Sequence, residues 1–297
     1  PDWTMEQLVE VARSLREDHR FAGYIHLKTI PEADPELLAR AGRYADRLSI
    51  NIELPSDSAI AALAPEKDGA RIRKTMADLG RRIGTAKAER QAAKGKARPP
   101  RFAPGGHSTQ MIVGADASND AAILTTSSRL YGDFGLKRVY YSAFSPIPDA
   151  SHRLPMAAPP LMREHRLYQA DWMLRFYGFS VDEIGSAMPN GSLDLAIDPK
   201  LAWAVANRAL FPVDLNRASR ELLLRVPGLG TKGVNAILTA RRFARLRLDD
   251  LHRICRAPKK MLPFVTLADW SPGALTDRQD LRGRLTPPAR QLDLFAA

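Results

Sequence analysis

Residues 214–238 read DLNRASRELLLRVPGLGTKGVNAIL. Ser219 precedes the apolar run 222–226, which predicts a short capped helix, and Thr231 begins a second helical pattern. Between them, Pro227-Gly228-Leu229-Gly230 predicts a tight turn, because glycine adopts backbone angles that are closed to other residues. Four apolar side chains are expected to pack the two helices together: Leu223, Val226, Leu229 and Ile237.

The predicted turn leads directly into the start of a helix, which is a favourable place for an anion. Free amides and the positive end of the helix dipole attract a negative group there, and Lys232 adds a point charge. Such contacts reach phosphate rather than base edges, so we predict DNA binding that does not depend on base sequence. The predicted DNA-binding residues are Gly228, Leu229, Gly230, Thr231 and Lys232. The alternative is a helical hairpin used only for packing or protein contact.

The charge of the chain is concentrated in the same region. The net charge of the 297 residues is +11. Residues 200–297 carry 18 Lys/Arg against 8 Asp/Glu, whereas residues 1–199 carry 26 against 25. A local basic surface attracts polyanions, although the same excess would also keep a protein soluble.

The segment 214–251 resembles the helix-hairpin-helix family, with Phe243, Leu246 and Leu248 leading into a third helix. Its lead-in, DLNRAS at 214–219, also resembles DNA-uptake receptor modules. Both resemblances imply a DNA-binding module.

The first half of the chain alternates helical and strand patterns. Strands are predicted over 21–30, 48–54, 110–114 and 138–144. Helices are predicted from a capping box at Thr4-Met5-Glu6-Gln7, with Leu8, Val11, Ala12 and Leu15 on one face, and over 35–44, 69–91 and 119–131. This order is typical of parallel βαβ units. Four strands are too few to close a barrel, and the chain begins at Pro1, so we expect further N-terminal units to be missing.

The pattern changes after Phe144. We predict a proline-rich loop over 145–160, then helices over 163–177, after Ser180 and after Asp198-Pro199, and a strand near 264–267. The tail from Ser271 is polar and is expected to be disordered. The predicted domains are 1–160 (partial barrel), 161–212 (helical connector), 213–268 (helix-hairpin-helix) and 269–297 (flexible tail).

Composition limits the possible cellular location of the protein and the possible roles of its cysteine. No apolar run approaches the ~20 residues that a membrane helix needs. Cys255 is the only cysteine and is expected to be a buried apolar residue, which excludes a disulfide framework and fits a cytoplasmic, nucleoid-associated protein.

Four segments of the first half resemble the later strands of radical S-adenosylmethionine (SAM) enzymes: 24–31, 48–55, 108–115 and 138–149. More narrowly, the chain resembles bacterial radical SAM proteins of DNA modification or repair, which join such a barrel to a C-terminal helix-hairpin-helix. The resemblance implies the α/β class, with a partial radical-SAM-type (β/α) barrel of later strands only, followed by an all-α helix-hairpin-helix domain.

The resemblance also implies a cofactor site. Asn51, Glu53 and the segment Gln110 to Gly114 would line the S-adenosylmethionine pocket, and the backbone around Tyr141 would meet the adenine. The family holds a [4Fe–4S] cluster through a Cys-x3-Cys-x2-Cys loop, which this sequence lacks. We therefore expect 5′-deoxyadenosyl radical chemistry on nucleic acid from the complete protein, and no activity from this chain.

The C-terminal pentapeptide Gln291-Leu292-Asp293-Leu294-Phe295 resembles the peptide that binds the bacterial sliding clamp. Gln291 would bond a polar pocket, while Leu292, Leu294 and Phe295 would fill an apolar one. The alternative is a tail that docks onto its own domain.

Two other functions fit parts of the sequence. In a helix-hairpin-helix DNA glycosylase/lyase, Lys232 would form the Schiff base and Asp250 would assist, although Asp249-Asp250-Leu251 predicts a helix start. The other is a non-catalytic DNA-binding adaptor that recruits partners to the clamp.

Overall fold

The computed structural model describes residues 1–93, 98–148, 151–255 and 258–287. The chain divides into two compact units, the first made of residues 1–118 and 125–164 and the second of residues 119–124 and those from 165 onward. The clamp-like residues Gln291, Leu292, Leu294 and Phe295 lie outside the described residues. No helix in the described ranges has the length and apolarity that crossing a membrane requires.

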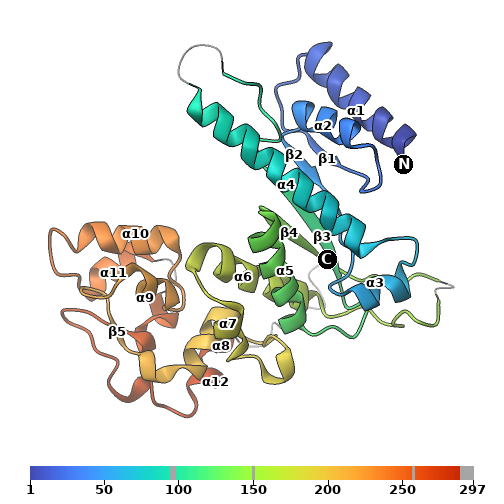
Figure 1. The fold of residues 1–297 in the computed structure, drawn as a ribbon. Coiled ribbons are helices and arrows are strands. Elements are labelled where there is room, and N and C mark those ends of the chain that lie inside the picture. The colour runs from blue at the N-terminus through green and yellow to red at the C-terminus, as the bar shows by residue number, and fades with distance from the viewer. Residues whose placement is uncertain (94–97, 149–150, 256–257, 288–297) are drawn as a thin grey trace, which may run out of the picture. The chain divides into compact units, whose positions relative to one another are not determined.

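The first unit contains a parallel sheet in the order β1-β2-β3-β4 (Figure 1). Its strands are β1 (His26–Lys28), β2 (Arg47–Ser49), β3 (His107–Val113) and β4 (Arg138–Ala143). Their registers pair His26 with Arg47, Ser49 with Ser108, and Gln110 with Tyr140. Sequential parallel strands joined by helices confirm the predicted α/β class and βαβ order.

The second strand is shorter than the predicted 48–54. Beyond Ser49 the chain still follows β3, but the amide of Ile52 donates to the hydroxyl of Thr109 rather than to a backbone carbonyl. At Glu53 the backbone turns into the left-handed region, with φ of 66°, and ends the extended stretch. A side-chain acceptor and one unusual dihedral therefore end the regular strand early.

Among the described residues, five α-helices accompany the sheet: α1 (Asp2–Glu17), α2 (Pro35–Tyr44), α3 (Asp57–Leu63), α4 (Gly69–Ala92) and α5 (Asp120–Phe134). The first turn of α5 belongs to the second unit. The predicted bounds of α2 and α4 are confirmed, and the Asp34 carboxylate caps α2 by accepting from the amide of Glu36. The sequence reading missed α3, which the hydroxyl of Ser56 caps.

The prediction for α1 was wrong in two respects. The helix begins at Asp2, so Thr4 lies inside it and caps nothing. Its buried stripe is Met5, Val9 and Ala12, while Val11 is 59% exposed. Because successive residues turn by about 100°, Val11 lies on the far side of the helix from Val9.

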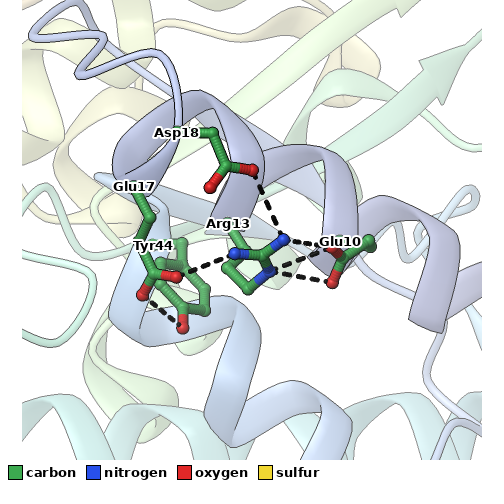
Figure 2. Close-up of polar contacts among 5 residues, drawn as sticks. All are labelled: Glu10, Arg13, Glu17, Asp18 and Tyr44. Carbon is green, nitrogen blue, oxygen red and sulfur yellow. Dashed lines mark hydrogen bonds and ion pairs between the residues drawn. The ribbon is translucent and has the colours of Figure 1, made fainter.

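An ionic network joins α1 to α2 (Figure 2). Arg13 contacts Glu10, Glu17 and Asp18, and the hydroxyl of Tyr44 donates to Glu17 over 3.0 Å. Hydrogen bonds to Glu10 and Glu17 raise the pKa of the Arg13 guanidinium. Glu17 thus connects the two helices, while Glu10 and Asp18 pair with Arg13 alone in this network, and such exposed pairs contribute little stability.

The second unit is mostly helical. Its helices are α6 (Leu161–Tyr177, whose first turn belongs to the first unit), α7 (Val181–Gly185), α8 (Pro199–Ala206), α9 (Arg220–Arg225), α10 (Thr231–Ala240), α11 (Leu248–Ile254) and α12 (Leu281–Leu285). The capping box of Ser180 with Glu183 and the Asp198 cap of α8 are confirmed. Two short strands, β5 (Val213–Asp214) and β6 (Val265–Thr266), pair in parallel, and β5 was not predicted.

The expectation of a disordered tail from Ser271 was wrong for the residues up to 287. This stretch contains α12, and its Leu281 side chain is 2% exposed. The buried hydroxyl of Thr276 donates to the carbonyl oxygen of Pro263. Burial of one leucine and one satisfied hydroxyl holds a segment whose composition is otherwise polar.

Candidate nucleic-acid interface

The lead-in to the hairpin has a structural role. The side-chain amide of Asn216 bonds both backbone groups of Leu246, accepting over 2.7 Å and donating over 3.2 Å. The carboxylate of Asp214 accepts from the backbone amide of Asn216, and the backbone amide of Leu215 donates to the carbonyl of Thr266. These bonds attach the segment before α9 to the segment before α11 and to β6. The Asp-Leu-Asn pattern therefore fixes the frame of the module.

The two helices of the hairpin pack as predicted. The four expected core side chains, Leu223, Val226, Leu229 and Ile237, are each at most 1% exposed. Ser219 caps α9 by accepting from the amide of Leu222 over 3.3 Å. The predicted helix pair and its apolar contact face are thereby confirmed.

The turn between the helices presents backbone to solvent. Gly228 is exposed and has φ of 80°, a backbone conformation that residues other than glycine rarely adopt. The Leu229 side chain is buried, and its backbone amide donates a hydrogen bond to the carbonyl of Val226 within the turn. Gly230 is the N-cap residue of α10 and offers no side chain to cap it.

The start of α10 has free hydrogen-bond donors. Within the described part of the chain, the amides of Gly230, Thr231 and Lys232 contact no acceptor. Lys232 is exposed on the first turn. Free amides, a positive helix end and an exposed ammonium group are features that suit an oxyanion.

A buried lysine supports the hairpin from within. Lys200, on α8, is 6% exposed, and its Nζ donates to the carbonyl oxygen of Leu224 over 2.6 Å and to that of Leu229. The Nζ also lies 4.4 Å from the centre of the Tyr177 ring. Its three protons therefore face two carbonyls and an aromatic face, which ties the end of α9 to the turn.

The protonation of Lys200 is sensitive to its burial. Burial lowers the pKa of Lys200 to about 7, while nearby Asp198 opposes the shift and Arg225 adds to it. The hydroxyl of Tyr177 would lie 3.3 Å from a Cβ added at Gly230, so this glycine leaves room for the supporting ring.

Arg225 supports the hairpin in a similar way. It pairs with Glu183 over 2.6 Å, and its guanidinium lies 4.8 Å from the centre of the Phe179 ring. Arg241 donates to the carbonyls of Leu215 and Ala218. These two arginines are used within the unit, so the cations that remain exposed for a ligand lie elsewhere.

One exposed aromatic residue was missed by sequence reasoning. Phe243 is 84% exposed, and Arg242 and Arg245 beside it are also exposed. The sequence pattern had assigned Phe243 to the apolar run that leads into the third helix. The flanking arginines, in Arg-Arg-Phe-Ala-Arg at 241–245, were the signal that could have identified it as a surface residue.

Asp250 occupies a helix start, as its sequence context predicted. Its carboxylate accepts from the backbone amide of Arg247 over 2.9 Å at the beginning of α11. This hydrogen bond gives the Asp250 carboxylate a capping role at the start of α11.

The predicted cosubstrate residues separate into two groups. Asn51 and Glu53 line a cavity of about 210 Å³ in the first unit, and Asn51 donates to the Gln110 side chain over 3.3 Å. Glu53 is paired there with Lys67 over 2.6 Å. Tyr141 is outside this group, because its side chain is 2% exposed and its hydroxyl bonds Ser127.

Gly114 is likewise absent from the lining of that cavity. Its φ is 83°, and a Cβ there would lie 2.7 Å from the ring of Pro159. Glycine at this position is explained by the backbone and by the neighbouring proline, without a ligand.

The chain does not supply the ligands of an iron–sulfur cluster. Such clusters are held by several thiolates, and Cys255 is the only cysteine. Cys255 is buried as predicted, and burial raises the pKa of its thiol. In the described ranges, no group of three His, Cys, Asp or Glu residues is placed to hold a metal ion.

No family model, curated protein or solved structure matches the chain. The geometry and charge of the residues above therefore carry the functional inference.

Proposed function

We propose that the second unit binds DNA through its phosphate backbone. The observation that carries this proposal is the turn Gly228 to Lys232, where free amides at the start of α10 lie beside an exposed lysine. A phosphate oxygen there would accept from the amides, and the helix dipole would favour its charge. The absence of a Cβ at Gly228 and Gly230 lets the phosphate approach the backbone closely.

The surrounding charge supports the same partner. Residues 200–297 have an excess of Lys/Arg, 18 against 8 Asp/Glu, and Arg242, Arg245 and Lys232 are exposed. Amide and lysine contacts to phosphate carry no base information, so the same affinity is expected for unrelated sequences. The electrostatic contribution should decline as salt rises, because bound phosphates release their counterions.

Fluorescence anisotropy with two duplexes of unrelated sequence tests this proposal. We expect equal dissociation constants for both duplexes and a linear fall of log affinity with log salt concentration. An affinity that does not change with salt concentration, or that differs strongly between the two duplexes, would contradict binding through the DNA phosphate backbone.

The glycosylase/lyase alternative has less support from the geometry. Lys232 is exposed on the first turn of α10, and the carboxylate of Asp250 is bonded to the amide of Arg247. A Schiff-base lysine works in a pocket that takes an extruded base. The surface position of Lys232 fits a phosphate contact better.

A second proposal concerns the first unit, where Asn51, Glu53 and Gln110 would bind a polar cosubstrate of the S-adenosylmethionine class. The specific observation is the left-handed backbone of Glu53, because strained non-glycine residues concentrate at functional sites. The cavity of about 210 Å³ is smaller than the ~300–1,000 Å³ of most ligand sites, so Lys67 would have to release Glu53. Radical chemistry would need a cluster whose ligands this chain lacks.

Calorimetry with S-adenosylmethionine tests the cosubstrate proposal. Binding should be lost in Glu53→Gln and kept in Glu36→Gln, a carboxylate of α2 that does not line the cavity. Absence of binding by the unmodified chain would refute it.

We also propose the sliding clamp as a partner, through Gln291, Leu292, Leu294 and Phe295. A pull-down tests this: deletion of 291–297 should abolish clamp capture and leave DNA affinity intact. Clamp capture that survives the deletion would refute the proposal.

A further inference from the structure

A basic groove lies in the first unit, in which the hairpin has no part. It has a volume of about 980 Å³ and is lined by residues of α2, α4 and the segments 31–33 and 99–102. Its apolar surface includes Ala33, Leu38, Leu79, Pro99 and Phe102. Its rim carries Arg43, Arg71, Lys74, Arg82 and Arg101. The groove therefore combines an apolar floor with a cationic rim.

A second hollow extends the groove along α4. It has a volume of about 450 Å³ and shares Ala86, Arg101 and Phe102 with the first. The charged residues lining it are Lys87, Arg90, Arg98 and Arg101, all of them cations. We call the two hollows together the α4 groove.

The sequence of α4 explains this charge. The helix carries seven Lys/Arg and two Asp/Glu, and its buried stripe is Ile72, Met76 and Leu79. The remaining faces are therefore largely basic. Phe102 packs against Gly42, where an added Cβ would collide with its ring, and the amide of Ala103 donates to the carbonyl of Gly42. These contacts set the wall opposite α4.

The groove has few anions of its own. Its acidic residues are Glu32, Asp78 and Glu89, and Asp78 is paired with Arg81. Arg71, Lys74 and Arg101 are exposed, and none of them forms an ion pair with a carboxylate of the described ranges. Since no carboxylate of the described residues pairs with them, they are available to an external polyanion.

We propose that the α4 groove binds single-stranded nucleic acid, with phosphates on the rim cations and bases on the apolar floor. A duplex hides its bases, so it would leave the floor uncovered, whereas an unpaired strand offers both groups at once. From Arg71 to Arg90 the helix rises about 28 Å, which suits a strand of several nucleotides rather than a small anion.

The test uses the full chain and a fluorescent oligothymidylate of about 20 nucleotides, a length above common site sizes. The variant Arg71→Gln/Lys74→Gln/Arg101→Gln removes three exposed cations without touching the core. We expect its affinity for the oligothymidylate to fall about tenfold and its salt slope to fall by about 2, while its duplex affinity changes less than about twofold.

The matched control is Arg73→Gln. Arg73 lies on the same helix but is paired with Asp57 over 2.6 Å. This control should bind the oligothymidylate like the unmodified chain. Unchanged binding of the triple variant would overturn the proposal. Equal losses for oligothymidylate and duplex would also overturn it, because they would indicate a general charge effect.

The result of the groove test can be distinguished from the result of the hairpin test. If Gly228→Val/Gly230→Val leaves duplex affinity intact while the triple variant loses the oligothymidylate, the proposed function fails and the α4 groove stands. If the glycine variant loses duplex affinity while the triple variant keeps its affinity for the oligothymidylate, the hairpin is supported and the groove is rejected.

Discussion

The Nζ of Lys200 donates a hydrogen bond to the carbonyl oxygen of Leu229, the residue between the two glycines of the hairpin. The same Nζ bonds the carbonyl of Leu224 over 2.6 Å. A single buried amine thus connects the last turn of α9 to the turn that presents the amides. The shape of the proposed phosphate site depends on a residue from another helix, α8.

Lys200→Met should destabilise the hairpin. The substitution keeps a similar apolar stem but leaves two buried carbonyls without their donor, at a cost of about 1–3 kcal/mol each. We expect a lower free energy of unfolding in urea and weaker duplex binding. Lys259→Met, an exposed lysine of the same unit, is the control. Equal stability of the two variants would contradict the supporting role of Lys200.

The same lysine predicts a dependence of stability on pH. Its pKa is about 7 in the folded chain, against ~10.4 for an unperturbed lysine, so between these values the unfolded chain binds more protons. Stability should therefore rise from about pH 7 toward pH 10, by at most about 1.4 kcal/mol per pH unit. Urea unfolding of the unmodified chain and of Lys200→Met at pH 7, 8 and 9 measures this. A stability difference between the two that stays constant with pH would count against it.

His107 predicts acid sensitivity of the first unit. The side chain is 1% exposed, and its Nε2 has no hydrogen-bond partner among the described residues. Burial, with a smaller effect of Lys137, lowers its pKa to about 4. Because the unfolded chain takes up the proton first, stability should be lost as pH falls from ~6.5 to about 4, by about 3 kcal/mol at most.

His107→Leu should reduce that loss. Unfolding measured between pH 7 and pH 4 by circular dichroism compares the two chains, and His152→Leu, an exposed histidine, is the control. A leucine variant as acid-sensitive as the unmodified chain would show that another group is responsible.

Local signals predicted much of the hairpin and of α4. Glycine at Gly228 and Gly230 and the apolar residues around them determine the turn through nearest neighbours. Gly69 begins α4 as expected, because Asp68 caps it locally. In each case the interacting groups are close in sequence.

Features that depend on distant contacts were not predictable. Lys200 follows a helix cap and has the sequence context of an exposed first-turn lysine, yet carbonyls from α9 and the hairpin bury it. Tyr141 alternates along a strand as a site residue would, but its hydroxyl bonds Ser127 of α5. The left-handed turn at Glu53 has no signature in an alternating strand pattern.

Borohydride trapping on abasic DNA separates phosphate binding from lyase chemistry. Because Lys232 is exposed and Asp250 is used as a helix cap, no covalent adduct is expected from the unmodified chain. An adduct that forms and then disappears in Lys232→Ala would establish the glycosylase/lyase alternative.

The affinity of Gly228→Val/Gly230→Val for duplex DNA tests the central claim most directly. The variant places side chains where a phosphate must approach, at a position with φ of 80° and beside the Tyr177 hydroxyl. Gly283→Val, where an added Cβ meets nothing within 4 Å, is the matched control. Lys232→Glu, a surface change, repeats the test without altering the backbone. We predict that both hairpin variants lose duplex binding while the control keeps it; duplex affinity equal in all three would contradict phosphate binding by the hairpin.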